Sequence, residues 1–161
     1  MAEENEKKTL RGLVISPASF IDILVGKSLV TGLMTVISLV FSLLIAGIEP
    51  FLALKPLIGL VLSFLFFLFL GIGIGLFAKT VAATSAYMMP VMFLFGFTPM
   101  LSNLGFDEDS IVMRIIDVFP LPQLINMHET GSWVPLGVIL IWLICAALFM
   151  YVCFRKTRTD D

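Results

Sequence analysis

The chain has 161 residues, of which 59% are hydrophobic and 14% are charged. Soluble domains are about 45–50% apolar and about 25% charged, so this composition excludes an ordinary soluble domain. The net charge of −2 is small and the basic residues form no stripe, which argues against a nucleic-acid partner. Composition therefore predicts an integral membrane protein.

Residues 1–27 predict a cytoplasmic segment that begins with a short amphipathic helix from Glu3 to Ile15. Leu10, Leu13 and Val14 recur at helical spacing and form a narrow apolar ridge among charged residues. A helix lying on the membrane surface is the alternative. Its apolar face would be narrow and its glutamates unfavourable near anionic lipid, so we expect a docking element.

The same segment contains a turn that leads into the membrane. Ser16 and Pro17 end the first helix, because a residue before proline disfavours the helical conformation. Ser19 and Asp22 have the spacing of a capping box, which predicts a second helix starting there. That helix is expected to enter the membrane past Lys27.

Four apolar runs without a charged residue predict four transmembrane helices. Each run has 21 to 23 residues, and a helix of that length covers roughly 30 Å, the hydrocarbon thickness of a bilayer. Every backbone polar group in hydrocarbon must be satisfied within the protein, so an all-α, polytopic membrane fold is expected. The runs are 28–48, 56–78, 80–101 and 133–154.

Lysine and arginine are distributed unequally between the two sides of this predicted bundle. If the N-terminus is cytoplasmic, the outer side has only Lys55 and Arg114, and eight other basic residues are cytoplasmic. This bias predicts that both termini, including the tail 155–161, lie on the cytoplasmic side of the cell membrane. The connection around Lys79 is so short that the second and third spans should form a tight antiparallel hairpin.

The longest connection, 102–132, is too apolar for an ordinary loop. Asp107 to Ser110 supplies acceptors suited to the start of a helix, which predicts a short helix directly after it. Pro120 and Pro122 break that helix, and a second short apolar piece follows. Both pieces are too short to span, so we expect two short outer re-entrant helices. A small extracellular cap packed on the bundle is the alternative.

Two groups of residues inside the spans suggest packing or a substrate path. Gly71 and Gly75 form a small-xxx-small pair, which predicts close helix packing, whereas a phosphate-binding loop would need a preceding strand. Met88, Met89 and Met92 are candidates to line a path for an apolar substrate, because methionine side chains adapt to varied shapes. Ordinary helix packing is the alternative for these methionines.

The sequence contains no catalytic constellation. His128 has no histidine or cysteine partner at metal-binding spacing, and the four runs contain no Asp, Glu, Lys or Arg. No nucleophile is paired with a base. The chain is therefore not expected to be an enzyme or to bind a metal or cofactor itself, and a membrane-embedded enzyme is the most remote alternative.

The stretch EENEKKTLRGLVISPASFIDILVGK resembles the cytoplasmic signature of ATP-binding-cassette (ABC) transporter permeases of the type 2 exporter class. That signature has paired acidic residues, Thr-Leu, a further Leu, Ser-Pro, and Gly-Lys at the mouth of a span. FPLPQL is similar to the family's outer re-entrant helices before the last span, and the resemblance covers nearly the whole chain. The matching signature positions are Glu4, Glu6, Thr9, Leu10, Leu13, Ser16, Pro17, Gly26 and Lys27.

The chain also departs from the family pattern. Lys8 stands where glycine is common, and Arg11 stands where an acidic residue is common. Family permeases typically have six spans with this signature between the second and third, so the chain resembles the last four spans. A natural short subunit, a truncated reading frame and one part of a split permease are all open.

The resemblance implies a permease subunit that exports an apolar or amphipathic substrate such as a drug, lipid, peptide or antibiotic. The chain has no Walker A motif, so ATP and Mg²⁺ would be bound by a separate ATPase subunit. A second permease copy or a homologous permease subunit would complete the transporter. The alternative is a non-transporting four-span membrane protein, such as an immunity or assembly factor.

The resemblance also assigns roles within the cytoplasmic segment, which acts as a coupling helix in this family. Leu10 and Leu13 would fill an apolar recess of the ATPase, and Ser16 and Pro17 would fix the turn. The ATPase-docking residues that it implies are Glu4, Glu6, Thr9, Leu10, Leu13, Ser16 and Pro17.

Overall fold

The computed structural model of the chain describes residues 20–47, 53–101 and 110–159, and the regular structure among these residues is all helical. The predicted all-α fold is thus confirmed for this part of the chain. The coupling helix and its turn, predicted within 1–19, lie outside the described residues. In chain order the elements are α3 (Phe20–Ala46), α4 (Leu54–Phe77), α5 (Val81–Val91), the π-helix η2 (Met92–Gly96), α6 (Thr98–Leu101), α7 (Ile111–Asp117), α8 (Pro120–Thr130) and α9 (Val134–Thr159).

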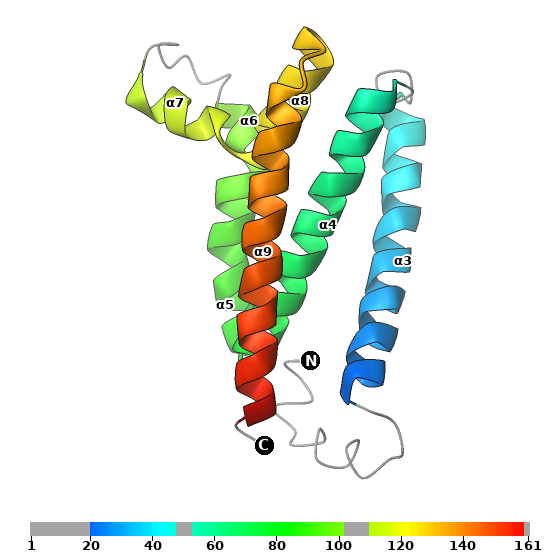
Figure 1. The fold of residues 1–161 in the computed structure, drawn as a ribbon, viewed down its shortest axis with the longest axis vertical. Coiled ribbons are helices and arrows are strands. Elements are labelled where there is room, and N and C mark those ends of the chain that lie inside the picture. The colour runs from blue at the N-terminus through cyan, green and yellow to red at the C-terminus, as the bar shows by residue number, and fades with distance from the viewer. Residues whose placement is uncertain (1–19, 48–52, 102–109, 160–161) are drawn as a thin grey trace.

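Three of these helices, α3, α4 and α9, contain a stretch long and apolar enough to cross a membrane (Figure 1). The prediction of a multi-pass membrane protein is confirmed to this extent. The stretches are Val25–Ile45, Leu54–Phe77 and Val134–Thr157, against predicted spans of 28–48, 56–78 and 133–154.

The predicted third span, 80–101, is divided into three helical pieces. Pro90 lies inside α5, and the α-helix gives way to the π-helix η2 two residues later. Proline removes a backbone donor and crowds the preceding turn, which is one of the established causes of a local change in helix geometry. Phe97 then interrupts the helix, and the Thr98 hydroxyl donates to the Leu94 carbonyl across the interruption. The apolar part of this segment, Val81–Gly96, is shorter than the three long helices.

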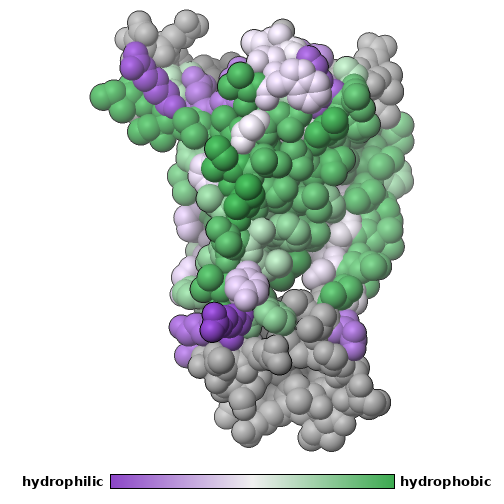
Figure 2. Space-filling model, in the orientation of Figure 1, coloured by the Kyte–Doolittle hydropathy of each residue, from purple (hydrophilic) through white to green (hydrophobic). Residues whose placement is uncertain are grey.

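Polar residues gather at the two ends of the bundle, with an apolar surface between them (Figure 2). α3 begins and α9 ends at the same end (Figure 1). This end carries Lys27, Lys79 and Lys156 and is called the charged end below. Lys55 lies at the opposite end, because α4 starts there.

Close contact between α4 and its neighbours depends on two glycines. A Cβ built on Gly73 would lie 2.6 Å from a ring carbon of Phe149 and 3.4 Å from the Cα of Met150, both on α9. A Cβ on Gly59 would likewise collide with the side chain of Met127 on α8. Glycine at these two positions therefore lets α9 and α8 approach the α4 backbone, as small residues do in membrane helix packing.

The connection between α6 and α9 contains two short helices, α7 and α8. The Ser110 hydroxyl accepts a hydrogen bond from the Met113 N–H at 3.2 Å and so caps α7. The prolines begin α8 rather than only ending α7: Pro120 is its first residue, where a missing N–H is tolerated. Gly131, at φ 61°, ends α8 in the left-handed region that favours glycine.

α8 is buried on one side against α4 and α9. Leu124 and Met127 of α8 form a buried cluster with Ile139 of α9, with Leu60 of α4 packed against it. Met127 is 1% exposed and Ile139 is fully buried. One face of α8 therefore belongs to the bundle core, and the opposite face, with Ile125 and His128, is exposed.

Candidate functional site

A cleft of about 690 Å³ lies between α3 on one side and α4 and α5 on the other. This volume falls within the range of about 300–1,000 Å³ that small-molecule sites occupy. The cleft exists because α3 packs loosely: only 6% of its span is buried, against 28% of the α4 span. Val30, which lines the cleft, is 58% exposed, so the cleft is open to the surroundings of the helices.

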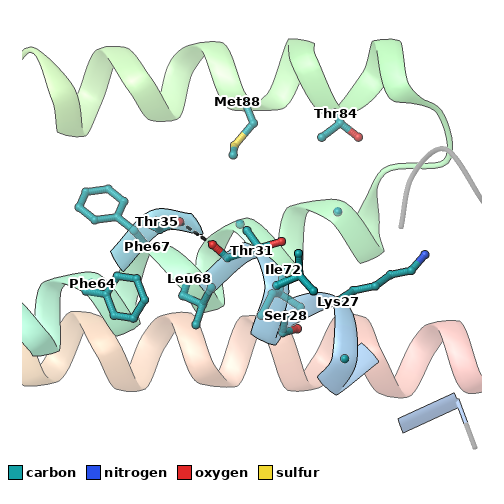
Figure 3. Close-up of a pocket in the computed structure, with 14 residues that line it drawn as sticks. Lys27, Ser28, Thr31, Thr35, Phe64, Phe67, Leu68, Ile72, Thr84 and Met88 are labelled. Atoms are coloured by element: carbon teal, nitrogen blue, oxygen red, sulfur yellow. Dashed lines mark hydrogen bonds between the residues drawn. The ribbon is translucent and has the colours of Figure 1, made fainter. Parts of the chain in front are cut away.

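The α3 wall of the cleft is lined with hydroxyl groups. Ser28, Thr31 and Thr35 fall on one face of the helix because their spacing is three and then four residues (Figure 3). The Thr35 hydroxyl donates to the Thr31 carbonyl at 2.8 Å, which satisfies its proton within the helix and leaves the oxygen as an acceptor.

The α4 wall is apolar, and glycine opens it. Phe64, Phe67 and Leu68 contribute side chains (Figure 3). Gly71 and Gly75 contribute bare backbone. A Cβ on Gly71 would have no neighbouring atom within 4 Å. Gly71 and Gly75, which were predicted to permit close helix packing, thus line the cleft. The close contact between α4 and α9 lies instead at Gly73, between these two glycines in the sequence.

α5 closes the cleft with Thr84 and Met88, both of which point toward it (Figure 3). The Thr84 hydroxyl donates to the Thr80 carbonyl at 3.1 Å. Of the three methionines predicted to line a substrate path, only Met88 lines this cleft. Met89 and Met92 are each 66% exposed and do not line it.

Polarity changes along the cleft. Lys27 lies at its charged-end mouth, near the start of the apolar stretch of α3 (Val25–Ile45), and Thr35 lies about 12 Å further along the helix at 1.5 Å per residue. Beyond Thr84 the lining on α4 and α5 is apolar side chain or glycine backbone. The cleft therefore offers a cation at its mouth, hydroxyl groups along its α3 wall and an apolar α4 wall.

A second feature, an aromatic cluster around Trp142 of α9, holds the turn between α7 and α8 against the bundle. The Trp142 Nε1–H donates to the Val118 carbonyl at 2.8 Å, and the Trp142 ring stacks on Phe119 with a centroid distance of 5.6 Å. Phe95 of η2 and Phe66 of α4 meet the same indole edge to face. The cluster thus joins α4, η2, α9 and the turn between α7 and α8.

This aromatic cluster was not predicted from the sequence. A signal was present, because Trp142 lies in the middle of a span, whereas tryptophan in membrane proteins concentrates at the interfaces. A tryptophan at that depth needs an acceptor for its indole N–H.

The other predicted site residues are placed as follows. The ATPase-docking residues Glu4, Glu6, Thr9, Leu10, Leu13, Ser16 and Pro17 lie outside the residues that the structure describes. His128 is exposed on α8. Within the described ranges, no group of three or more His, Cys, Asp or Glu side chains could hold a metal ion.

No protein-family model matches the chain, and neither a curated protein nor a solved structure is significantly similar to it.

Proposed function

We propose that the chain is the membrane-spanning permease subunit of an ABC transporter of the type 2 exporter class. It would export an apolar or amphipathic substrate, driven by ATP hydrolysis in a separate ATPase subunit that binds ATP and Mg²⁺. Its partners would be that ATPase and a second permease copy or a homologous permease subunit.

The observation that carries this proposal is the order of the elements. Two long helices are followed by a broken apolar segment, two short helices joined at Phe119, and a last long helix. This is the order that the sequence resemblance implies after its coupling helix. In the proposal, α5, η2 and α6 together form the third of the four spans, and α7 and α8 form the outer re-entrant pair.

The proposal also sets the orientation in the membrane. The charged end, with Lys27, Lys79 and Lys156, would face the cytoplasm because basic residues accumulate on that side. Both termini would then be cytoplasmic, and the α7–α8 pair would lie on the outer side of the cell membrane.

The packing of the helices suggests how an ATPase could act on the bundle. The buried clusters join α4, η2, α8 and α9, and among the side chains that the structure describes none from α3 belongs to them. α3 follows the docking segment directly and is the least buried of the three long helices. A force applied to the coupling helix would therefore displace α3 relative to the other helices and change the shape of the cleft.

The experiment that tests the proposal replaces the two ridge leucines of the coupling helix. The wild-type chain, purified from its native membrane, is expected to bring an ABC ATPase with it and to stimulate its ATP hydrolysis. Leu10→Asp and Leu13→Asp should abolish both effects, because a carboxylate cannot enter an apolar recess without a large desolvation penalty. Lys7→Asp, on the polar side of the same predicted helix, is the control and should retain both.

Two results would contradict the proposal. If both leucine variants bind and stimulate the ATPase as the wild type does, the docking role is wrong. If no ATPase accompanies the wild-type chain, the alternative of a non-transporting four-span membrane protein is favoured.

A further inference from the structure

The cleft between α3, α4 and α5 covers only part of the membrane thickness. Its lining runs from Gly26 to Thr35 on α3 and from Phe64 to Gly75 on α4. At 1.5 Å per residue these segments measure about 14 Å and about 17 Å, whereas the hydrocarbon core is roughly 30 Å thick. The cleft therefore reaches from the charged end to about the middle of the bilayer, which is the depth of one leaflet.

This depth decides between two possible occupants. A transmembrane helix of a partner would need a groove along most of the bilayer, and the lining ends halfway. A lipid of one leaflet has its headgroup at the surface and its acyl chain reaching the midplane. The polarity changes in the same direction from Lys27 at the mouth to Phe64 and Phe67 of the α4 wall at the deep end, where Thr35 of α3 keeps a hydroxyl group whose proton is bonded within its helix.

The charge at the mouth indicates which headgroup is favoured. Lys27 lines the mouth, and exposed Lys79 lies at the same end in the turn between α4 and α5. Asp22 is on α3 at this end as well, but it does not line the cleft. Lysines near a membrane surface attract anionic lipid, and a long lysine stem can lie along apolar side chains while its ammonium group reaches the headgroups.

We propose that this cleft binds an anionic phospholipid from the leaflet at the charged end, with one acyl chain between α3 and α4 and the phosphate at Lys27. The lipid would fill the gap that loose packing leaves beside α3. The inference requires insertion in a membrane and does not require transport.

The test measures the lipid that the full chain retains. The protein is purified in detergent, equilibrated with equal amounts of phosphatidylglycerol and phosphatidylcholine, and examined by native mass spectrometry. We expect one retained lipid per chain and a preference for phosphatidylglycerol of about fivefold, which corresponds to about 1 kcal/mol for one lysine near an anionic headgroup. Lys27→Met should abolish the preference for phosphatidylglycerol, although the protein should still retain one lipid through its acyl chain. Lys156→Met, at the same end on α9, is the control and should keep the preference.

A second pair of variants tests the acyl-chain site. Gly71→Leu places a side chain in the cleft, where a Cβ meets no atom within 4 Å, and should remove most of the retained lipid. Gly137→Leu is the matched control, because Gly137 on α9 also has open space around its Cβ but does not line the cleft. Met88→Trp fills the cleft from α5 and repeats the test if Gly71→Leu does not fold.

Three results would overturn the proposal. The first is equal retention of the two lipids by the wild type, and the second is retention that Gly71→Leu and Met88→Trp leave unchanged. The third is a change of oligomeric state, in which the wild type is a larger assembly and Gly71→Leu is a single chain of 17.8 kDa. That result would show that a partner helix occupies the cleft. None of these readouts involves an ATPase, so they are independent of the test of the proposed function.

Discussion

Gly73→Ala should weaken the contact between α4 and α9, and Gly71→Ala, one half-turn away on the same helix, should not. The added methyl at Gly73 would lie 2.6 Å from the Phe149 ring, whereas the methyl at Gly71 meets no atom within 4 Å. Both variants gain the same helix propensity over glycine. Their difference in stability therefore isolates the steric effect of one methyl group.

The magnitude follows from the geometry. Carbon atoms in contact are about 3.5–4.0 Å apart, so the Phe149 ring must withdraw by about 1 Å. The ring can move because Phe149 is 36% exposed, but the Met150 Cα, 3.4 Å from the new methyl, belongs to the backbone. Overpacking typically costs about 1–3 kcal/mol, and the freedom of the ring places the expected loss at about 1–2 kcal/mol.

Unfolding in mixed micelles with increasing sodium dodecyl sulfate measures this difference. Trp142 reports the transition because its indole is packed among Phe95, Phe119 and Phe66. Trp133→Phe in every variant removes the second tryptophan. If Gly73→Ala and Gly71→Ala have the same free energy of unfolding, α4 and α9 do not make the close contact at Gly73 from which this prediction is derived.

Two further predictions concern single hydrogen bonds. Trp142→Phe removes the bond from the indole N–H to the Val118 carbonyl and should lower the unfolding free energy by about 0.6–1.7 kcal/mol, measured by circular dichroism; no loss would contradict the assigned bond. Thr80→Ala removes the hydroxyl that accepts from the Ala83 N–H at 3.1 Å, a cap worth about 0.5–2 kcal/mol. Hydrogen exchange in the first turn of α5 should therefore accelerate in Thr80→Ala but not in Thr80→Ser, and equal rates in the two variants would refute the cap.

The long helices could be predicted from the sequence because a charge-free run of more than 20 apolar residues has few other uses in a chain of this composition. The interruption of the third run could not be predicted in the same way. Residues 92–97 are as apolar as their surroundings, so hydropathy does not reveal a change from α-helix to π-helix. Pro90 is the local signal, and it marks a disturbance without specifying its form.

The glycines of α4 show a similar limit at the site. Gly71 and Gly73 are about 200° apart around the helix, so the GIGIG sequence places small residues on two opposite faces. Spacing alone predicts that small residues permit close approach, but it does not reveal which face meets a neighbour. In the structure Gly73 faces α9, and Gly71 faces the cleft beside α3.

The position of α8 has a consequence for how the protein is made. α8 precedes α9 in the chain, yet Leu124 and Met127 pack against Ile139 of α9. Synthesis proceeds from the N-terminus, so α8 exists before the helix that covers it. During that interval α8 has α4 as a neighbour, through Gly59, and one side of α8 is uncovered. Insertion of α9 is therefore the step of biosynthesis that covers α8, and a ribosome that stops before Val134 leaves a chain in which Leu124 and Met127 lack their contact with Ile139.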